Sequence, residues 1–260
     1  SGETADTLAA VREAKQLGML TLGVVNVVGS TIARETAAGV YNHAGPEIAV
    51  ASTKAFISQL TVMSLVTLLL GRARGSMSES EGAELVAALE QLPTQIETVL
   101  KTASHVADVA KQYASRQHMM FIGRNAHAPI AAEGALKLKE VSYIHAEAYA
   151  AGELKHGPIA LLDEQFPVVA LAPQDSVYEK MLSNIEEVKA RKAPLIVVVT
   201  EGDTEAVRLA DDVFVVPKVH PLLQPILSVI PLHLLAYYVG VEKGYNVDRP
   251  RNLAKSVTVE

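Results

Sequence analysis

Three ionisable residues, Glu133, Lys137 and Glu140, lie in the segment EGALKLKEVSYIHAEAYAAGELKHGP at a spacing that places them on one helix face. Glu followed four residues later by Lys is also the favourable order for an ordinary exposed salt bridge. Here the neighbouring residues are mostly small or apolar, so the polar face is narrower than a solvated helix displays. The pattern therefore fits either a surface salt bridge or a charged stripe in a cleft, where such groups could transfer protons.

His156 follows this helix in the sequence KHGP, where Gly157 and Pro158 predict a turn. An imidazole titrates near neutral pH and suits acid–base chemistry, although a loop histidine without such a role is the ordinary alternative. The segment between the helix and His156, which contains Glu147 and Glu153, is predicted to be a loop. The eight histidines include no pair at a metal-ligand spacing such as HxxxH, so we expect no metal site.

Two hydroxyl-rich segments stand where predicted helices begin. Ser1 and Thr4, in SGETADT, combine hydroxyls with the exposed backbone N–H groups of a helix start, which suits an anion such as phosphate. The same segment could instead form a capping box. Ser52 and Thr53 precede a long apolar helix, and simple capping is the ordinary interpretation there.

The C-terminal segment NVDRPRNLAKSVTVE has a composition unlike that of a frayed chain end, because it contains Pro250 and the apolar pair Leu253 and Ala254. Lys255 within it would ordinarily be a solvated surface charge.

The composition excludes several classes of function. The chain has 260 residues, of which 49% are hydrophobic and 20% charged, as in a globular protein. Its net charge of −6 and the lack of a Lys/Arg-rich run argue against nucleic acid as a partner. The absence of cysteine removes disulfides, thiolate metal sites and cysteine nucleophiles. Two apolar stretches, QLTVMSLVTLLLG and PLLQPILSVIPLHLLAYYVG, are expected to be buried core helices, so we expect a soluble, cytoplasmic protein without a membrane partner.

The elements that must position these residues form an internal repeat, seen when Ser1 is aligned with Asp175. Each copy contains a helix, an apolar strand, a short helix with an arginine (Arg34 or Arg208), a short strand and a long apolar helix. Apolar strands such as PLIVVVT alternating with helices predict parallel sheets covered on both faces. Few identities support the repeat, and any α/β chain resembles itself after a shift by whole βα units.

The second copy is preceded by the strands HMMFIG and FPVVALAP, which have no counterpart before the first copy. We therefore expect the first domain to be truncated at its N-terminus, since a sheet without its central strand exposes an edge. The expected organisation is the first domain at residues 1–76, the second at 77–244 and a tail at 245–260 that closes the site. Ser78 or Ser80, and Pro93, are predicted helix starts.

Four segments together, SGETADT, EIAVASTKAF, EGALKLKEVSYIHAEAYAAGELKHGP and DRPRNLAKSVTVE, closely resemble the isomerase half of the glutamine–fructose-6-phosphate aminotransferase (isomerizing) family. The resemblance covers essentially the whole chain. It implies an α/β fold of two flavodoxin-like SIS domains with parallel sheets, the first of them truncated here. It also implies an enzyme that binds fructose 6-phosphate, isomerises ketose to aldose with incorporation of ammonia, and yields glucosamine 6-phosphate without a cofactor. The implied partners are a glutaminase domain that releases the ammonia and a second copy in a homodimer.

The resemblance also implies roles for residues that bind the sugar phosphate. Ser1 and Thr4 match the loop that holds the phosphate. Val50 and Ala254 match positions that line the sugar.

The catalytic roles are likewise implied by the resemblance. Glu140 matches the base that moves a proton between sugar carbons 1 and 2, with Glu133 and Lys137 beside it as substrate-binding residues. His156 matches a group from the neighbouring subunit that assists ring opening, and Lys255 matches the lysine that forms a Schiff base with the open ketose.

Two alternatives to an enzyme remain open at this point. A non-enzymatic SIS module that senses a phosphosugar would need the phosphate loop, but not Glu140, His156 and Lys255 together. A fragment without binding competence would follow from the truncation. Binding of fructose 6-phosphate to the chain separates the fragment from the other two.

Overall fold

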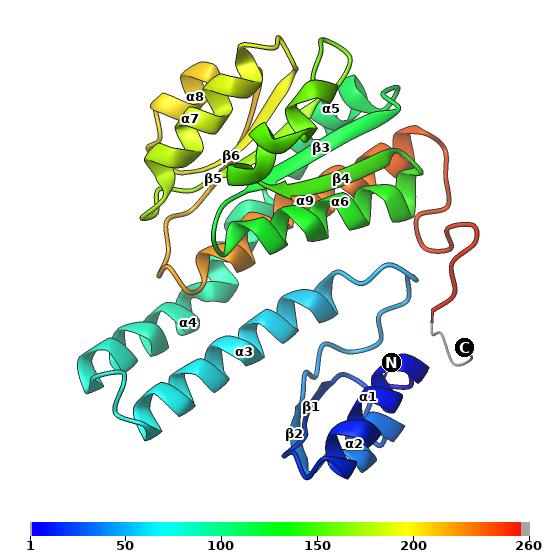
Figure 1. Cartoon of the computed structure of the whole chain (residues 1–260), viewed down its shortest axis with the longest axis vertical. Coiled ribbons are helices and arrows are strands. Elements are labelled where there is room, and N and C mark those ends of the chain that lie inside the picture. Colours follow the sequence, from blue (N-terminus) through cyan, green and yellow to red (C-terminus); the bar gives the residue numbers. More distant parts are fainter. Residues whose placement is uncertain (1, 256–260) are drawn as a thin grey trace. The chain divides into compact units, whose positions relative to one another are not determined.

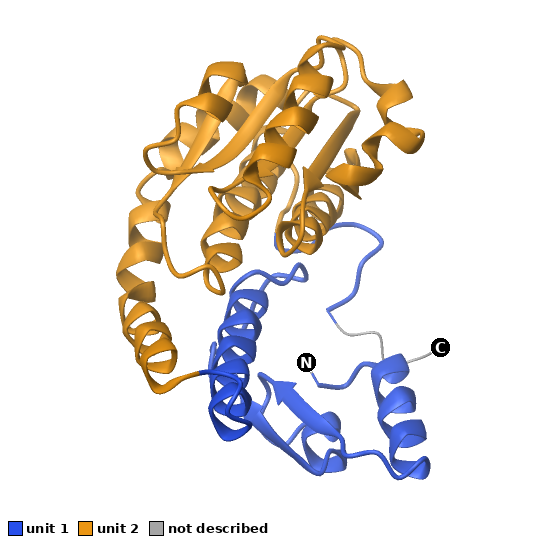
Figure 2. Cartoon of the chain, turned by 60° about the vertical axis from the view of Figure 1, so that its left-hand side comes forward, with its two compact units in different colours: residues 1–77, 248–260 blue, residues 78–247 orange. Residues whose placement is uncertain are grey.

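The chain divides into two compact units in a computed structural model that describes residues 2–255. Unit 1 comprises residues 1–77 and 248–260, and unit 2 comprises residues 78–247 (Figure 2). The C-terminal segment therefore belongs to the same unit as the N-terminus. These units are defined by contacts within the structure, so the domain boundaries expected at residues 76 and 244 remain predictions.

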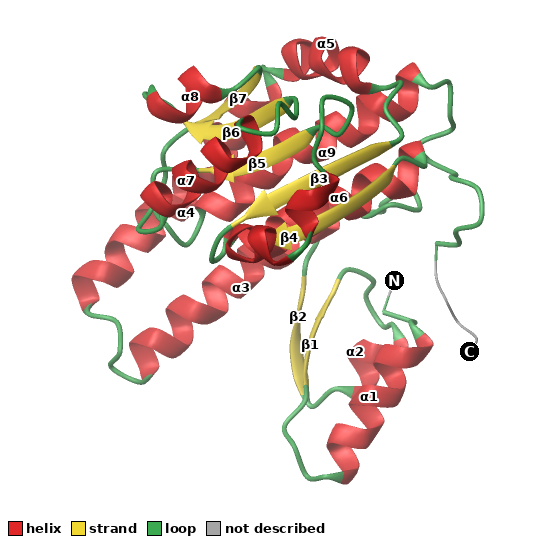
Figure 3. Cartoon of the chain, turned by 45° about the horizontal axis from the view of Figure 1, so that its top comes forward, coloured by secondary structure: helices red, strands yellow, loops and turns green. Residues whose placement is uncertain are grey.

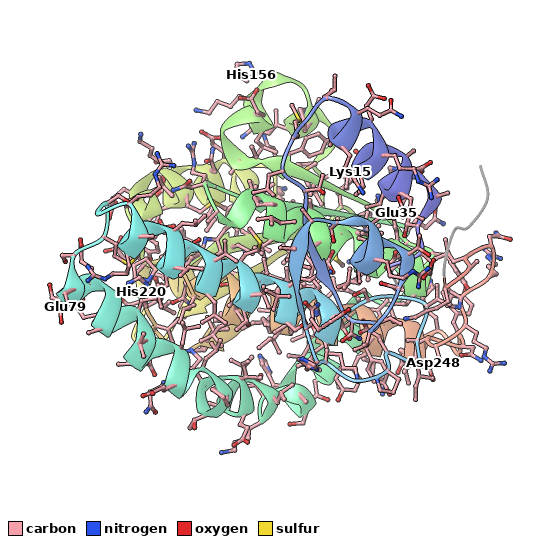
Figure 4. All side chains as sticks on the ribbon, turned by 90° about the horizontal axis from the view of Figure 1, so that it is seen from below. Lys15, Glu35, Glu79, His156, His220 and Asp248 are labelled. Atoms are coloured by element: carbon pink, nitrogen blue, oxygen red, sulfur yellow. The ribbon has the colours of Figure 1, made fainter. Side chains whose placement is uncertain are left out.

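Unit 1 is built on a pair of parallel strands (Figure 1). Its elements in chain order are α1 (Ala5–Gln16), β1 (Leu22–Val25), α2 (Thr31–Glu35), β2 (Ala38–Tyr41) and α3 (Lys54–Ala73). Arg12 on α1 forms an ion pair with Glu35 at the end of α2, at 2.7 Å. The Lys15 ammonium donates to the backbone carbonyl of Glu35 at 2.7 Å, so two contacts tie α1 to α2 (Figure 4).

Unit 2 is a doubly wound α/β unit (Figure 3). Its elements are α4 (Glu79–Leu100), α5 (Ala103–Tyr113), β3 (His118–Gly123), α6 (His127–Ser142), β4 (His145–Ala150), the 3₁₀ helices η1 (Ala151–His156) and η2 (Pro158–Leu161), β5 (Val168–Ala172), α7 (Tyr178–Lys189), β6 (Leu195–Thr200), α8 (Glu205–Leu209), β7 (Asp212–Val216) and α9 (Gln224–Glu242). The five strands are parallel, in the order β4-β3-β5-β6-β7. This is the flavodoxin-like order, so the fold predicted from the sequence is confirmed.

Helices cover both faces of this sheet. Alternate residues of β3 serve the two faces: Met120 and Ile122 join the core formed with α7, α8 and η1, whereas Phe121 packs toward α6. All residues of β5 and β6 are buried, as their continuous apolar runs predict. The core of unit 2 therefore places α6 and α9, which pack against each other, on one face of the sheet.

Two local features differ from the sequence predictions. The segment HAEAYA, predicted as a loop, is the edge strand β4, which pairs with β3 along its length. Its alternate residues His145, Glu147 and Tyr149 carry polar groups and are exposed or partly exposed, so its sequence lacks the apolar run of a central strand. Ser78 begins α4 with a capping box as predicted, but Pro93 lies inside that helix rather than at a helix start.

Within residues 2–255, α3 and α9 are long and apolar enough to cross a membrane, judged by length and composition alone. The prediction that both are buried core helices is confirmed for α9, most of which is buried. It is wrong for α3 in this chain, where Val62 and Ser64 are the buried residues and Leu69 is 67% exposed.

The close approach of strand to helix at Gly123, the last residue of β3, generates a stability prediction. A β-carbon there would lie 2.3 Å from the backbone carbonyl oxygen of His127, so the backbone would have to move. We expect Gly123→Ala to lower the free energy of unfolding of unit 2 by about 1–3 kcal/mol, measured by urea denaturation. The control is Gly152→Ala, whose nearest atom would be 3.6 Å away. The control should change stability by about 0.5 kcal/mol or less; equal losses would contradict the explanation.

Candidate functional site

Unit 1 contains a cavity of about 600 Å³, within the range of small-molecule sites. Three residues expected at the sugar phosphate, Thr4, Val50 and Lys255, line it. Two residues that sequence analysis did not assign to the sugar, Glu47 and Ser52, line it as well. Residues far apart in the sequence are therefore brought to one cavity.

Thr4 stands at the N-cap position of α1, yet its side chain makes no hydrogen bond to the helix. The capping-box alternative is therefore wrong for Thr4. The neighbouring carboxylate of Glu3 accepts a hydrogen bond from the Thr31 backbone N–H at 2.8 Å, and hydrogen bonding by Thr31 lowers the pKa of Glu3. The Thr4 hydroxyl is thus not used to cap α1 at the edge of the cavity. Ser1, the other expected phosphate ligand, lies outside the described residues.

Glu47 caps α3 from six residues before Thr53. Its Oε1 accepts the backbone N–H groups of Thr53 at 2.6 Å and Lys54 at 3.0 Å, and its Oε2 accepts the Ser52 hydroxyl at 3.1 Å. Burial alone would raise the pKa of Glu47, but the hydrogen bonds from Thr53 and Ser52 outweigh it and hold that pKa below its usual value. The side chain of Thr53 does not cap the helix, so that interpretation is wrong. The sequence signal for this cap is Glu47 itself, a glutamate six residues before Thr53 in the segment PEIAVASTK.

The C-terminal segment returns to the loop before α3, within the same unit. The Val50 backbone N–H donates to the carbonyl of Asp248 at 3.0 Å. The Lys255 ammonium donates to the carbonyl of Ala49. Ala254 is exposed, and it is not among the described residues that line the cavity. In the C-terminal segment, Lys255 therefore lines the cavity and Ala254 does not.

Unit 2 holds the charged stripe, and the shared helix face predicted from its spacing is confirmed. Lys137 Nζ is 2.5 Å from Glu140 Oε2 and 3.8 Å from Glu133 Oε1. The side chains of Glu133, Lys137 and Glu140 are 9%, 5% and 20% exposed. The low exposure excludes an ordinary solvated salt bridge on the surface. Burial of an unpaired charge is costly, and each of these three charges lies close to one of opposite sign. A buried carboxylate held by an ammonium can accept and return a proton at a bound substrate.

A residue that sequence analysis missed completes this group. His233, on α9, places its Nε2 3.0 Å from Glu133 Oε1. His233 lies in a very apolar helix, where a single histidine does not indicate its partner. Glu133 is a hundred residues earlier in the chain, so sequence spacing does not relate the two residues.

His156 is the last residue of η1, so it closes a 3₁₀ helix rather than a simple turn. The following Gly157 has a φ of 138°, a conformation that favours glycine. The imidazole is exposed, and Figure 4 shows it pointing outward from the ribbon. Within residues 2–255, no hydrogen bond or ion pair joins it to the stripe, and no group of His, Asp and Glu side chains could hold a metal ion.

The chain is similar in sequence to a known domain family and to named proteins. The SIS domain family matches residues 1–69 and 112–243. Glutamine–fructose-6-phosphate aminotransferase [isomerizing] from Thermus thermophilus is 56% identical over the whole chain, which covers 43% of that protein. The corresponding protein from Chlorobaculum tepidum is 50% identical, with 42% covered. The chain thus spans less than half the length of these relatives.

Solved structures give the same result. The C-terminal domain of glucosamine-fructose-6-phosphate aminotransferase from Francisella tularensis has a TM-score of 0.91 and 40% identity, over 96% of this chain and 70% of that one. A putative phosphosugar isomerase from Silicibacter pomeroyi has a TM-score of 0.78 and 27% identity, over 95% and 71% of the two chains. The resemblance found in the sequence is confirmed.

The carboxylate of Glu47 generates a pH-dependent prediction. Because its pKa is lowered in the folded protein, its contribution to stability is present above the unfolded pKa and is lost as pH falls through the lowered folded value. At neutral pH, Glu47→Gln should destabilise unit 1 by about 1 kcal/mol, as for loss of a helix cap, and the difference should shrink in acid. Glu13→Gln, the same change at an exposed site on α1, is the control for thermal unfolding between neutral and acidic pH. A difference independent of pH would contradict this.

Proposed function

The chain belongs to the SIS domain family, and we propose that it is the isomerase portion of a glutamine–fructose-6-phosphate aminotransferase. Its substrate would be fructose 6-phosphate and its product glucosamine 6-phosphate. The single observation that carries the proposal is the position of Lys255, which lines the same cavity as Thr4 although the two residues lie at opposite ends of the chain. A phosphosugar-sensing module would need no lysine there.

In this proposal the cavity of unit 1 holds the sugar phosphate. Thr4 donates its hydroxyl to the phosphate at the start of α1, where the helix dipole favours an anion. Ser1 would add a second hydroxyl. Val50 lines the cavity and would contact the sugar there. The same role for Ala254 rests on the family resemblance alone.

Lys255 would form the covalent intermediate. Its amine attacks the C2 carbonyl of the open ketose, the carbinolamine loses water, and an imine results. A neutral amine is needed for this attack. The hydrogen bond from Lys255 to the Ala49 carbonyl supports the proposal, because it holds the amine at the cavity that would contain the sugar.

Glu140 would move the proton. As a carboxylate it takes the proton from C1 of the sugar and returns it to C2, which converts the ketose skeleton to the aldose. Lys137, 2.5 Å away, holds the carboxylate, and Glu133 holds Lys137 from the other side.

The finer parts of the proposal concern partners. Ammonia would come from a glutaminase domain, as expected from the family resemblance. It would add to C2 of the imine and displace the Lys255 amine, so that the ammonia nitrogen stays on the sugar and the lysine is released. His156 would assist ring opening in a neighbouring subunit, and its exposed, outward position supports this role. A homodimer in the cytoplasm is the corresponding assembly.

The Schiff base generates a direct prediction. Borohydride treatment of the full-length enzyme with fructose 6-phosphate should trap the sugar on Lys255, located by peptide mass spectrometry. Lys255→Arg should abolish trapping and turnover, because a guanidinium stays charged and is not an amine nucleophile. Glu140→Gln should retain trapping while turnover falls by about 100-fold or more, as on removal of a general base.

Lys111→Arg, the same change at an exposed position on α5, is the matched control and should trap and turn over normally. Turnover by Lys255→Arg, or sugar found on Lys137 instead, would show that the assigned roles are wrong.

The role of His156 generates a prediction about assembly. We expect sedimentation to show a dimer or larger assembly at micromolar concentration. Mixing His156→Ala protein with Lys255→Arg protein should restore turnover in part, because a mixed dimer then contains one site with both residues intact. A folded, active monomer would contradict the proposal.

A further inference from the structure

The buried histidine of α9, His233, contacts the charged stripe at one particular atom. Its Nε2 lies 3.0 Å from Glu133 Oε1, and the two side chains are 7% and 9% exposed. Lys137 approaches the same oxygen only to 3.8 Å, whereas it lies 2.5 Å from Glu140. Glu133 therefore takes its short contact from α9, and the Lys137 ammonium is directed to Glu140.

The composition of the buried group explains why a further partner is needed. Two carboxylates, Glu133 and Glu140, face one ammonium, and a carboxylate taken out of water needs hydrogen bonds to remain charged. If Lys137 alone served both, it would be shared between them. The imidazole of His233 supplies the additional contact to Glu133, so Lys137 need not move toward it.

The backbone fixes the distance between His233 and Glu133. Next to Glu133, a β-carbon at Gly134 would lie 2.7 Å from the side chain of Leu232, the neighbour of His233. Further along, a β-carbon at Gly240 would lie 2.9 Å from the Val141 carbonyl oxygen. These glycines let α6 and α9 approach closely beside the contact and again further along the helix pair. The contact is therefore a built feature of the helix pair, not a chance meeting of long side chains.

We propose that His233 is a positioning residue for the proton transfer, which holds Glu133 and so directs Lys137 to Glu140. This inference rests on the proposed function, since it takes Glu140 as the base. Without His233, Glu133 competes for Lys137, and the ammonium is drawn away from Glu140. The Glu140 carboxylate then loses its fixed position at the sugar, while imine formation at Lys255 is not affected.

The test uses the full-length enzyme, with kcat, KM and borohydride trapping measured on each variant. His233→Leu removes the donor and keeps the site apolar. Its kcat should fall about 10- to 100-fold, since displacing a catalytic group by about 1 Å costs about 100-fold. Its KM and its trapping on Lys255 should stay within about twofold, because only the proton transfer is affected.

Conservative variants keep the test decisive if His233→Leu does not fold. His233→Gln can still donate to Glu133 and should recover most of kcat. His233→Asn is as polar but too short to reach, and its kcat should fall as in His233→Leu.

The matched control is His127→Leu, which removes a different buried histidine, on α6. Its Nε2 contacts Ser228 of α9 at 3.2 Å, away from the stripe, and burial lowers the pKa of His127 to about 4, so it is neutral. Its kcat should be unchanged.

Each outcome decides between the claims. If His233→Leu or His233→Asn turns over at the wild-type rate, or if kcat and trapping fall together in proportion to lost stability, the positioning role is overturned. If the unaltered enzyme neither traps fructose 6-phosphate nor turns it over, the proposed function fails instead, and the inference fails with it.

Discussion

The buried carboxylate of Glu133, which contacts His233 of α9 and Lys137 of α6, is the interaction on which the charged stripe of unit 2 depends. An apolar helix can carry charge in its interior only if every charge is paired. That requirement forces α6 and α9 close together, and Gly134 permits the approach because it has no side chain to displace Leu232. The sheet beneath, with its fully buried central strands, keeps both helices on one face. The stripe is thus a rigid feature, suited to holding Glu140 still.

In unit 1, the partly buried carboxylate of Glu47 is stabilised by hydrogen bonds from backbone N–H groups. Glu47 caps α3, so the hydroxyls before that helix are already engaged, whereas the Thr4 hydroxyl makes no bond to α1. The Asp248 carbonyl, bonded to the Val50 N–H, anchors the C-terminal segment and carries Lys255 to the cavity. The start of α3 is therefore capped by the protein's own carboxylate, whereas the side chain of Thr4 does not cap the start of α1. This division agrees with a phosphate at α1 and a sugar near the loop before α3.

The sequence predicted those features of the fold and site that depend on residues close together in the chain. Continuous apolar runs predicted the central strands, Ser78 predicted the start of α4, and spacing alone placed Glu133, Lys137 and Glu140 together. What was missed depends on partners distant in the chain. The polar edge strand β4 is a strand because β3 pairs with it, and His233 matters because α6 lies against α9. The sequence predicts a helix start at Pro93, but α4 continues through it. The sequence also predicts that α3 is buried, but its apolar residues are largely exposed here.

The proposed function requires Glu140, on the charged stripe of α6, to transfer a proton on the sugar. The most direct measurement is hydrogen exchange at C1 of fructose 6-phosphate in D₂O, followed by NMR of the recovered ketose in the absence of an ammonia source. The unaltered enzyme should introduce deuterium at C1. Glu140→Gln should not, although its sugar remains bound to Lys255 as the imine. Exchange at C1 that continues undiminished in Glu140→Gln would contradict the account, because another group would then be moving the proton.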